Sequence, residues 1–297
     1  MSTITLSDHF NYRKLLRFTL PSIAMMIFTS IYSVVDGVFV SNFVGKTPFA
    51  AVNLMMPFLF LIGVVGSVLG TGGSALVAKT LGEGDRGKAN SIFSMLVVVS
   101  FVSGVVFGLI GLVFLERIAI LLGADASMMD NCVLYGRILL LALPFFILQS
   151  MFQGFLVTAE RPQLGLLFTV IAGLLNILLD YLLIVVFDMG LRGAAWATLI
   201  ASAVGGLAPL LFFLLPNKTM LHLVRPVYDG KALWQSITNG MSEFFSSISG
   251  SILSICYNYQ LMKYLGENGV AAYGVIMYVQ FIFFGVFFGL PKARHPS

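Results

Sequence analysis

Eight apolar segments, each long enough to cross a lipid bilayer, dominate this sequence. A hydrocarbon core of about 30 Å is crossed by roughly 20 residues of helix. Backbone polar groups in lipid must form their hydrogen bonds within the segment, which selects helices over isolated strands. The sequence therefore predicts an all-α integral membrane protein, a polytopic helical bundle with spans near residues 15–40, 48–78, 91–115, 132–158, 164–187, 194–215, 233–262 and 270–290.

Charge and cysteine usage exclude several other classes of protein. Only 10% of the residues are charged, whereas soluble domains are about one quarter charged. In a membrane protein a net charge of +4 indicates basic cytoplasmic loops rather than a nucleic-acid partner. Cys132 and Cys256 lack the spacing of a disulfide framework or a thiolate metal site. We therefore expect no nucleic-acid partner and no bound cofactor.

Lysine and arginine are distributed unevenly over the connections between the segments. If the N-terminus is inside, twelve of them lie on the cytoplasmic side and five outside: Lys46, Arg117, Arg137, Arg192 and Lys263. Because cytoplasmic loops carry the excess of basic residues, we expect a multi-pass protein of the plasma membrane with a cytoplasmic N-terminus. We expect it to act as a monomer.

The sequence repeats itself at an offset of 221 residues, the separation of Gly45 from Gly266 and of Ala50 from Ala271. Six spans separate the copies, so both have the same orientation and form a parallel repeat. We predict a six-helix N-lobe at 1–215, a cytoplasmic inter-lobe loop at 216–232, and a partial C-lobe at 233–290 that holds the first two helices of a pseudo-symmetric second lobe.

The end of the sequence departs from this repeat. A complete second copy would extend the chain to about 442 residues. The final residues, LPKARHPS, share only their leading leucine with LGTGGSAL, the matching stretch of the first copy. We expect an aberrant tail at 291–297, a C-terminal truncation and about four missing helices.

Polar side chains inside the apolar segments are the candidate binding residues. At 1.5 Å per residue, Asp36 and Asp180 lie within roughly 6 to 11 Å of the outer interface. Asn176 lies one turn deeper than Asp180 on the same helix face, and Tyr135 and Thr198 fall in the layer of the acids. An acid in hydrocarbon pairs, binds a cation or is protonated. We predict that these residues face the interior of the bundle.

Other readings of the acids remain open at this point. Asp36 and Asp180 are interfacial acids in one reading, and in another one of them pairs with Arg137. An enzyme is excluded, although Gly82 to Asp85 match the GxGD pattern of intramembrane aspartyl proteases. Asp85 lies in a loop on the other side of the membrane from the two acids, and the sequence has no nucleophile triad, metal motif or Walker loop.

Three further residues are candidates outside the layer of the acids. Pro21 either hinges the first span by removing a backbone hydrogen bond or occupies the first turn, where proline costs nothing. Glu243 either lines a central cavity or pairs near the inner surface. Gln153 is a candidate substrate contact.

The chain resembles the multidrug and toxic compound extrusion (MATE) family, close to its DNA-damage-inducible F-like branch. The resemblance rests on Pro21 with Asp36, GEGDRGKA, QGFLVTAERP, NILLDYLLI and GLRGAAWATLIA, and covers the chain to about residue 290. It implies twelve helices in two lobes, with Pro21 as the hinge of the first. It also implies an H⁺ or Na⁺ site, with Tyr135 and Gln153 nearby, formed by Asp36, Asn176, Asp180 and Thr198.

The function that this resemblance implies is cation-coupled antiport, exporting organic cations and amphiphilic drugs by alternating access, here in truncated form. One alternative is a flippase for lipid-linked oligosaccharides from the wider superfamily, for which basic cavity residues would be expected. Another is a fragment or assembly partner that transports nothing. Apart from the coupling ion, the expected partners are small-molecule drugs and the lipid bilayer.

Overall fold

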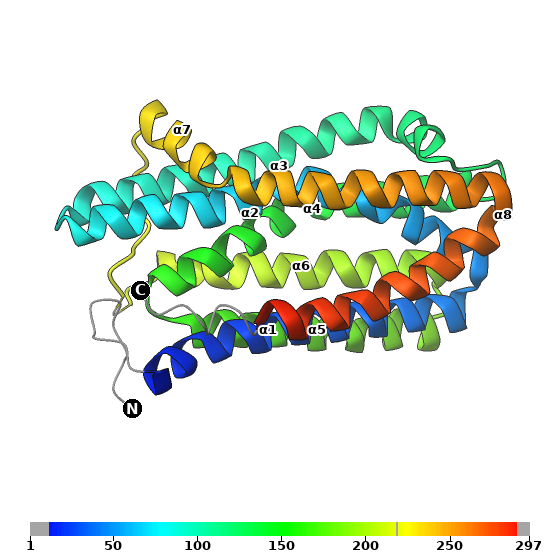
Figure 1. Cartoon of the computed structure of the whole chain (residues 1–297), viewed down its shortest axis with the longest axis horizontal. Coiled ribbons are helices and arrows are strands. Elements are labelled where there is room, and N and C mark those ends of the chain that lie inside the picture. Colours follow the sequence, from blue (N-terminus) through cyan, green and yellow to red (C-terminus); the bar gives the residue numbers. More distant parts are fainter. Residues whose placement is uncertain (1–11, 218, 290–297) are drawn as a thin grey trace.

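The computed structural model describes residues 12–217 and 219–289, and every regular element in these ranges is a helix. The long helices lie side by side along one axis (Figure 1). Within the part of the chain that the structure describes, six stretches are long and apolar enough to cross a membrane, which confirms the helical bundle. The helices that supply them are α1 (Tyr12–Phe39) with η1 (Val40–Val44), α2 (Lys46–Gly82), α3 (Arg86–Leu122), α4 (Met129–Thr158), α5 (Pro162–Asp180) with η2 (Tyr181–Val186), and α6 (Gly190–Leu214).

The connections between these helices follow local sequence signals. Asp85 is the N-cap of α3 and accepts a hydrogen bond of 3.0 Å from the backbone N–H of Lys88, as a capping acid does. Gly123 ends the same helix in the left-handed conformation, and Pro162 begins α5. Asp85 is therefore a capping residue, in agreement with the exclusion of the protease reading.

Two short π-helical segments follow the acid-bearing helices. The segment η1 begins four residues after Asp36, and η2 begins at Tyr181, directly after Asp180. A π-turn widens the helix and shifts the face that later residues present, and such turns occur frequently at functional sites. Both acids therefore lie within about one turn of the point where the α-helix becomes a π-helix.

The second copy of the repeat folds differently from the expected span at 233–262. The helix breaks at Gly240, which leaves a ten-residue α7 (Gly230–Asn239) before α8 (Met241–Gly289). The break has a physical cause: α7 ends in the polar sequence SITN and packs on α2, where Gly72 leaves no room for a side chain between the helices. The long helix of the second copy therefore begins later than the predicted span, at Met241.

The helix α8 contains the turn that the repeat predicts. Gly266 has φ 63° and ψ −156°, and the chain folds back there, so that the limbs 241–265 and 267–289 form a hairpin (Figure 1). Its repeat partner Gly45 has φ 122° and ψ 174° between η1 and α2. The two copies therefore turn at matched glycines. The predicted tail at 291–297 lies outside the described residues.

The connection expected as the inter-lobe loop is held against the bundle. Leu221 is fully buried. The backbone N–H groups of His222 and Val224 donate to Asn90 Oδ1 at 3.1 Å and to Ser94 Oγ at 2.9 Å. Asn90 and Ser94 are one turn apart in α3, so a single face of that helix fixes the connection.

Candidate functional site

The two predicted acids meet inside the bundle. Asp36 in α1 and Asp180 at the end of α5 lie close enough for their carboxyl groups to interact. The exposed fraction of each residue is small, 7% for Asp36 and 0% for Asp180. Two buried carboxylates this close repel each other unless one is protonated or a cation lies between them.

A glycine in α5 allows α1 to approach closely enough for this contact. A Cβ atom at Gly173 would lie 2.5 Å from Phe28 Cε1 and 2.9 Å from Tyr32 Cδ1. Asp36 follows Tyr32 by one helical turn, and Asp180 follows Gly173 by about two. The rings of α1 therefore pack over the glycine, and the acids meet above this contact. Sequence reasoning missed Tyr32, although its i−4 spacing from Asp36 was a usable signal.

The acid pair leaves polar atoms unsatisfied. Among the residues that the structure describes, Asp36 Oδ1, both carboxyl oxygens of Asp180 and Asn176 Nδ2 are buried and have no hydrogen-bond partner. An unpaired buried acceptor costs about 1–3 kcal/mol, and more when it is charged. Several oxygens in one place instead form a ligand set suited to a small hard cation. The donor set therefore fits H⁺ or Na⁺.

Tyr135 and Thr198 lie on the other two helices of this region. Tyr135 in α4 is 1% exposed, in an apolar cluster that also contains Val40, Ile184 and Ala194, which lie one turn from Asp36, Asp180 and Thr198. Thr198 in α6 is half-buried, and its hydroxyl donates to the Ala194 carbonyl at 3.1 Å. Its oxygen keeps free lone pairs for a cation.

The structure places three other predicted residues away from the acids. Gln153 borders a narrow gap beside Thr169 in α5, and it lies about 27 Å along α4 from Tyr135 at 1.5 Å per residue. Glu243 is exposed in the first turn of α8. Pro21 lies in the interior of α1, which begins at Tyr12, so the hinge reading of Pro21 is favoured over a first-turn proline.

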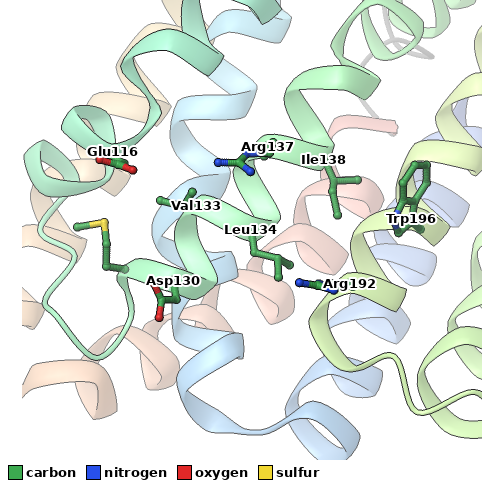
Figure 2. Close-up of a pocket in the computed structure, with 9 residues that line it drawn as sticks. Glu116, Asp130, Val133, Leu134, Arg137, Ile138, Arg192 and Trp196 are labelled. Carbon is green, nitrogen blue, oxygen red and sulfur yellow. The ribbon is translucent and has the colours of Figure 1, made fainter.

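Arg137 does not neutralise the acid pair. It is exposed and lines a surface pocket of about 440 Å³ between α3, α4 and α6, together with Glu116, Asp130, Arg192 and Trp196 (Figure 2). We call this the α3–α4–α6 pocket. The interpretation in which Arg137 pairs with a membrane acid is therefore wrong, because Arg137 is exposed on the outside of the bundle.

A polytopic helical bundle with a sheltered acid pair is typical of membrane transporters, since intramembrane ionisable groups mark ion and substrate pathways. Comparison with known families agrees with this class. The family model described as MatE matches residues 21–182 of the 297, more than half of the sequence, and the chain belongs to this family. Its members are transporters and not enzymes.

Individual relatives extend the comparison. The multidrug export protein MepA of Staphylococcus haemolyticus is 26% identical over 265 residues, which cover 89% of this chain and 58% of the relative. MepA of Staphylococcus aureus strain MRSA252 is 24% identical over the same length and coverage. A multidrug resistance MATE family transporter solved in an inward-facing conformation superposes with a TM-score of 0.82 at 25% identity, covering 93% of this chain and 63% of that one. The chain thus spans 58% of the length of these curated relatives.

Proposed function

We propose that the protein exports organic cations and other amphiphilic drugs in exchange for H⁺ or Na⁺, and that the coupling ion binds at Asp36 and Asp180. The observation that carries this proposal is the buried carboxyl pair, with unpaired oxygens and an unpaired amide one turn away. The curated relatives support the substrate class, because they are multidrug export proteins.

Coupling requires that the ion favours one packing of the bundle over another. Without a cation, two carboxylates in a dry cluster repel each other and push α1 away from α5. With a cation or proton between them, α1 is drawn onto the Gly173 face. The ion therefore biases the position of α1 by the difference between these two states.

The helix α1 can transmit this bias to the second copy of the repeat. It packs against α5 at the acids and also contacts α8, while Pro21 removes one backbone hydrogen bond below the acids. A bend at Pro21 would change both contacts together, as hinge motions do. Ion binding in the first copy would then alter access to the space between the copies.

The flippase alternative fits less well. A lipid-linked pyrophosphate would need basic groups to hold it, whereas the polar cluster in the bundle interior is acidic. With the predicted orientation, the N-terminus lies in the cytoplasm, and the two acids lie near the outer side of the membrane.

Purified chain in lipid vesicles tests the proposal. Vesicles loaded with ethidium and given an opposing H⁺ or Na⁺ gradient should lose the dye faster than vesicles without a gradient. Asp180→Asn should abolish the gradient-driven part. Asp188→Asn is the matched control, because Asp188 is exposed near the same end of the bundle and its φ of 51° suits asparagine. Wild-type chain that transports nothing under either gradient would favour the assembly-partner reading.

A further inference from the structure

The α3–α4–α6 pocket carries four charges that have no partner among the described residues. Glu116, Asp130, Arg137 and Arg192 all line it, and none of them forms an ion pair or a hydrogen bond with its side chain within residues 12–217 and 219–289. Opposite charges in one pocket ordinarily pair with each other when the geometry allows it. Here both signs remain available to a ligand that carries both.

The charges are sorted by sign across the pocket. Glu116 and Asp130 lie on one side, Arg192 and Trp196 on the other, and Arg137 lies between them (Figure 2). The spacing of Asp130 and Arg137 places them two turns apart on one face of α4, and Arg192 and Trp196 are one turn apart in α6. A dipolar ligand would meet acids at one end and guanidinium groups at the other.

The pocket lies at the depth of the lipid headgroups in the membrane. The helix α3 has 37 residues and is therefore about 55 Å long, longer than a bilayer of about 40–45 Å including its headgroups. Arg192 lies two residues from the start of α6 and Arg137 eight residues from the start of α4. Trp196 is 41% exposed, as tryptophan at a membrane interface is.

Below the charges, the surface becomes apolar. Leu134 and Ile138 line the pocket, and Leu141, one turn further along α4, is 51% exposed. A cavity of about 440 Å³ is within the size range of small-ligand sites. The surface thus passes from a charged layer through a tryptophan to an exposed aliphatic face. A phospholipid changes in the same order, from its charged headgroup to its acyl chains.

We infer that the α3–α4–α6 pocket binds a zwitterionic phospholipid with a primary ammonium headgroup. Arg137 and Arg192 would hold the phosphate, for which guanidinium groups are suited. Glu116 and Asp130 would accept hydrogen bonds from the ammonium group. The acids disfavour an anionic headgroup, and a quaternary ammonium group has no N–H to donate to them. With the predicted orientation, the lipid belongs to the outer leaflet. This site is separate from the acid pair and independent of the transport proposal.

Tryptophan fluorescence can report the occupant directly. The chain has two tryptophans, so Trp234→Phe leaves Trp196 as the sole reporter. The variant is placed in phosphatidylcholine vesicles that contain increasing amounts of one lipid with brominated acyl chains, which quench nearby tryptophan. We expect brominated phosphatidylethanolamine to quench Trp196 at about fivefold lower mole fraction than brominated phosphatidylglycerol or phosphatidylcholine. A factor of about five is what two exposed charge contacts would contribute to binding.

Charge variants in the same background separate the parts of the site. Glu116→Gln with Asp130→Asn should remove the preference over both phosphatidylglycerol and phosphatidylcholine. Arg137→Gln with Arg192→Gln should raise the mole fraction of brominated phosphatidylethanolamine needed for quenching, because the phosphate is no longer held. Arg117→Gln is the matched control, because Arg117 is exposed in the same turn of α3 and does not line the pocket. Circular dichroism verifies that each variant is folded, and Arg192→Gln alone replaces the double variant if that one misfolds.

Two outcomes would overturn the inference. Equal quenching by the three brominated lipids would show unselective contact with surrounding lipid. Displacement of the brominated lipid by soluble glycerophosphoethanolamine, as effective as displacement by the intact lipid, would show a site for a soluble phosphate ester instead.

Discussion

The carboxyl groups of Asp36 and Asp180 face each other across the contact between α1 and α5, and both residues are buried. The two helices run in the same direction, so a small displacement of α1 changes the separation of the carboxyl groups without breaking either helix. A buried charge that loses its partner is strongly destabilising. The pair therefore links the charge state of the site to the position of α1.

The first prediction concerns the ion dependence of stability. A cation that binds only the folded chain stabilises it by about 2.7 kcal/mol at one hundred times its dissociation constant. We expect the midpoint of thermal unfolding in detergent to rise with Na⁺ relative to choline, or with H⁺. Asp36→Asn and Asp180→Asn should remove that rise, because each takes away one of the two acids.

Asp188→Asn serves as the control here too and should respond as wild type does. The neutral variants are expected to unfold no more easily than wild type without the ion, since a buried unpaired acid is lost. An undiminished ion response in both variants would place the coupling ion elsewhere.

The second prediction concerns the close approach of α1 and α5. Gly173→Ala would place a methyl group 2.5 Å from Phe28 Cε1 and 2.9 Å from Tyr32 Cδ1, so these rings must shift and α1 with them if they cannot turn aside. We expect a destabilisation of about 1–3 kcal/mol and a weaker ion response, because the acids separate. Thermal unfolding with and without the ion measures both effects.

Gly165→Ala is the matched control for this variant. It lies in the same helix, and its Cβ atom would meet no atom closer than 3.7 Å. Alanine should be neutral there or stabilising by up to about 1 kcal/mol, because glycine is the poorer helix former. Equal effects of the two substitutions would contradict the proposed role of Gly173.

The sequence was sufficient to predict the helical bundle and the burial of Asp36 and Asp180, for a common reason. Long apolar segments permit few structures in lipid, and an acid such as Asp180 in such a segment must be sheltered. The repeat was also readable, because Gly45 and Gly266 occupy matched positions and both adopt a positive φ.

Other features depend on packing that a single sequence does not display. The break at Gly240 arises from the contact of α7 with α2, and the π-turns after Asp36 and Asp180 from the local winding of those helices. Gln153 was grouped with the acids by resemblance, but it lies at another level of α4. Counting about 1.5 Å per residue along α4 from Tyr135 would have shown that Gln153 lies at a different depth from the acids.

The third prediction concerns the matched turns of the two copies. Gly45 and Gly266 have backbone angles that only glycine adopts readily. Replacing either one by alanine should cost about 1–3 kcal/mol, measured as a lower midpoint of thermal unfolding. Gly82→Ala is the control, because its Cβ atom would meet nothing within 4 Å and its φ is not positive. A neutral Gly266→Ala would contradict the assigned turn.

The fourth prediction concerns the contact between those turns. Glu267 accepts a hydrogen bond of 2.7 Å from the Thr47 hydroxyl, and its carboxylate lies 3.9 Å from Lys46 Nζ. Lys46 and Glu267 are repeat partners, so the two copies meet at equivalent positions on the same side of the membrane. The short hydrogen bond to a charged acceptor should matter more than the long, half-exposed ion pair.

Thr47→Val should therefore cost about 1.5–3 kcal/mol, and Lys46→Met no more than about 1 kcal/mol. The ion-pair contribution should disappear in 1 M salt, where the screening length is about 3 Å, whereas the cost of Thr47→Val should persist. Lys79→Met, in an exposed pair with Glu83 at 3.9 Å, controls for loss of a surface charge. If Lys46→Met were the costlier change at both salt concentrations, charge attraction and not the hydroxyl would hold the two copies together at this side.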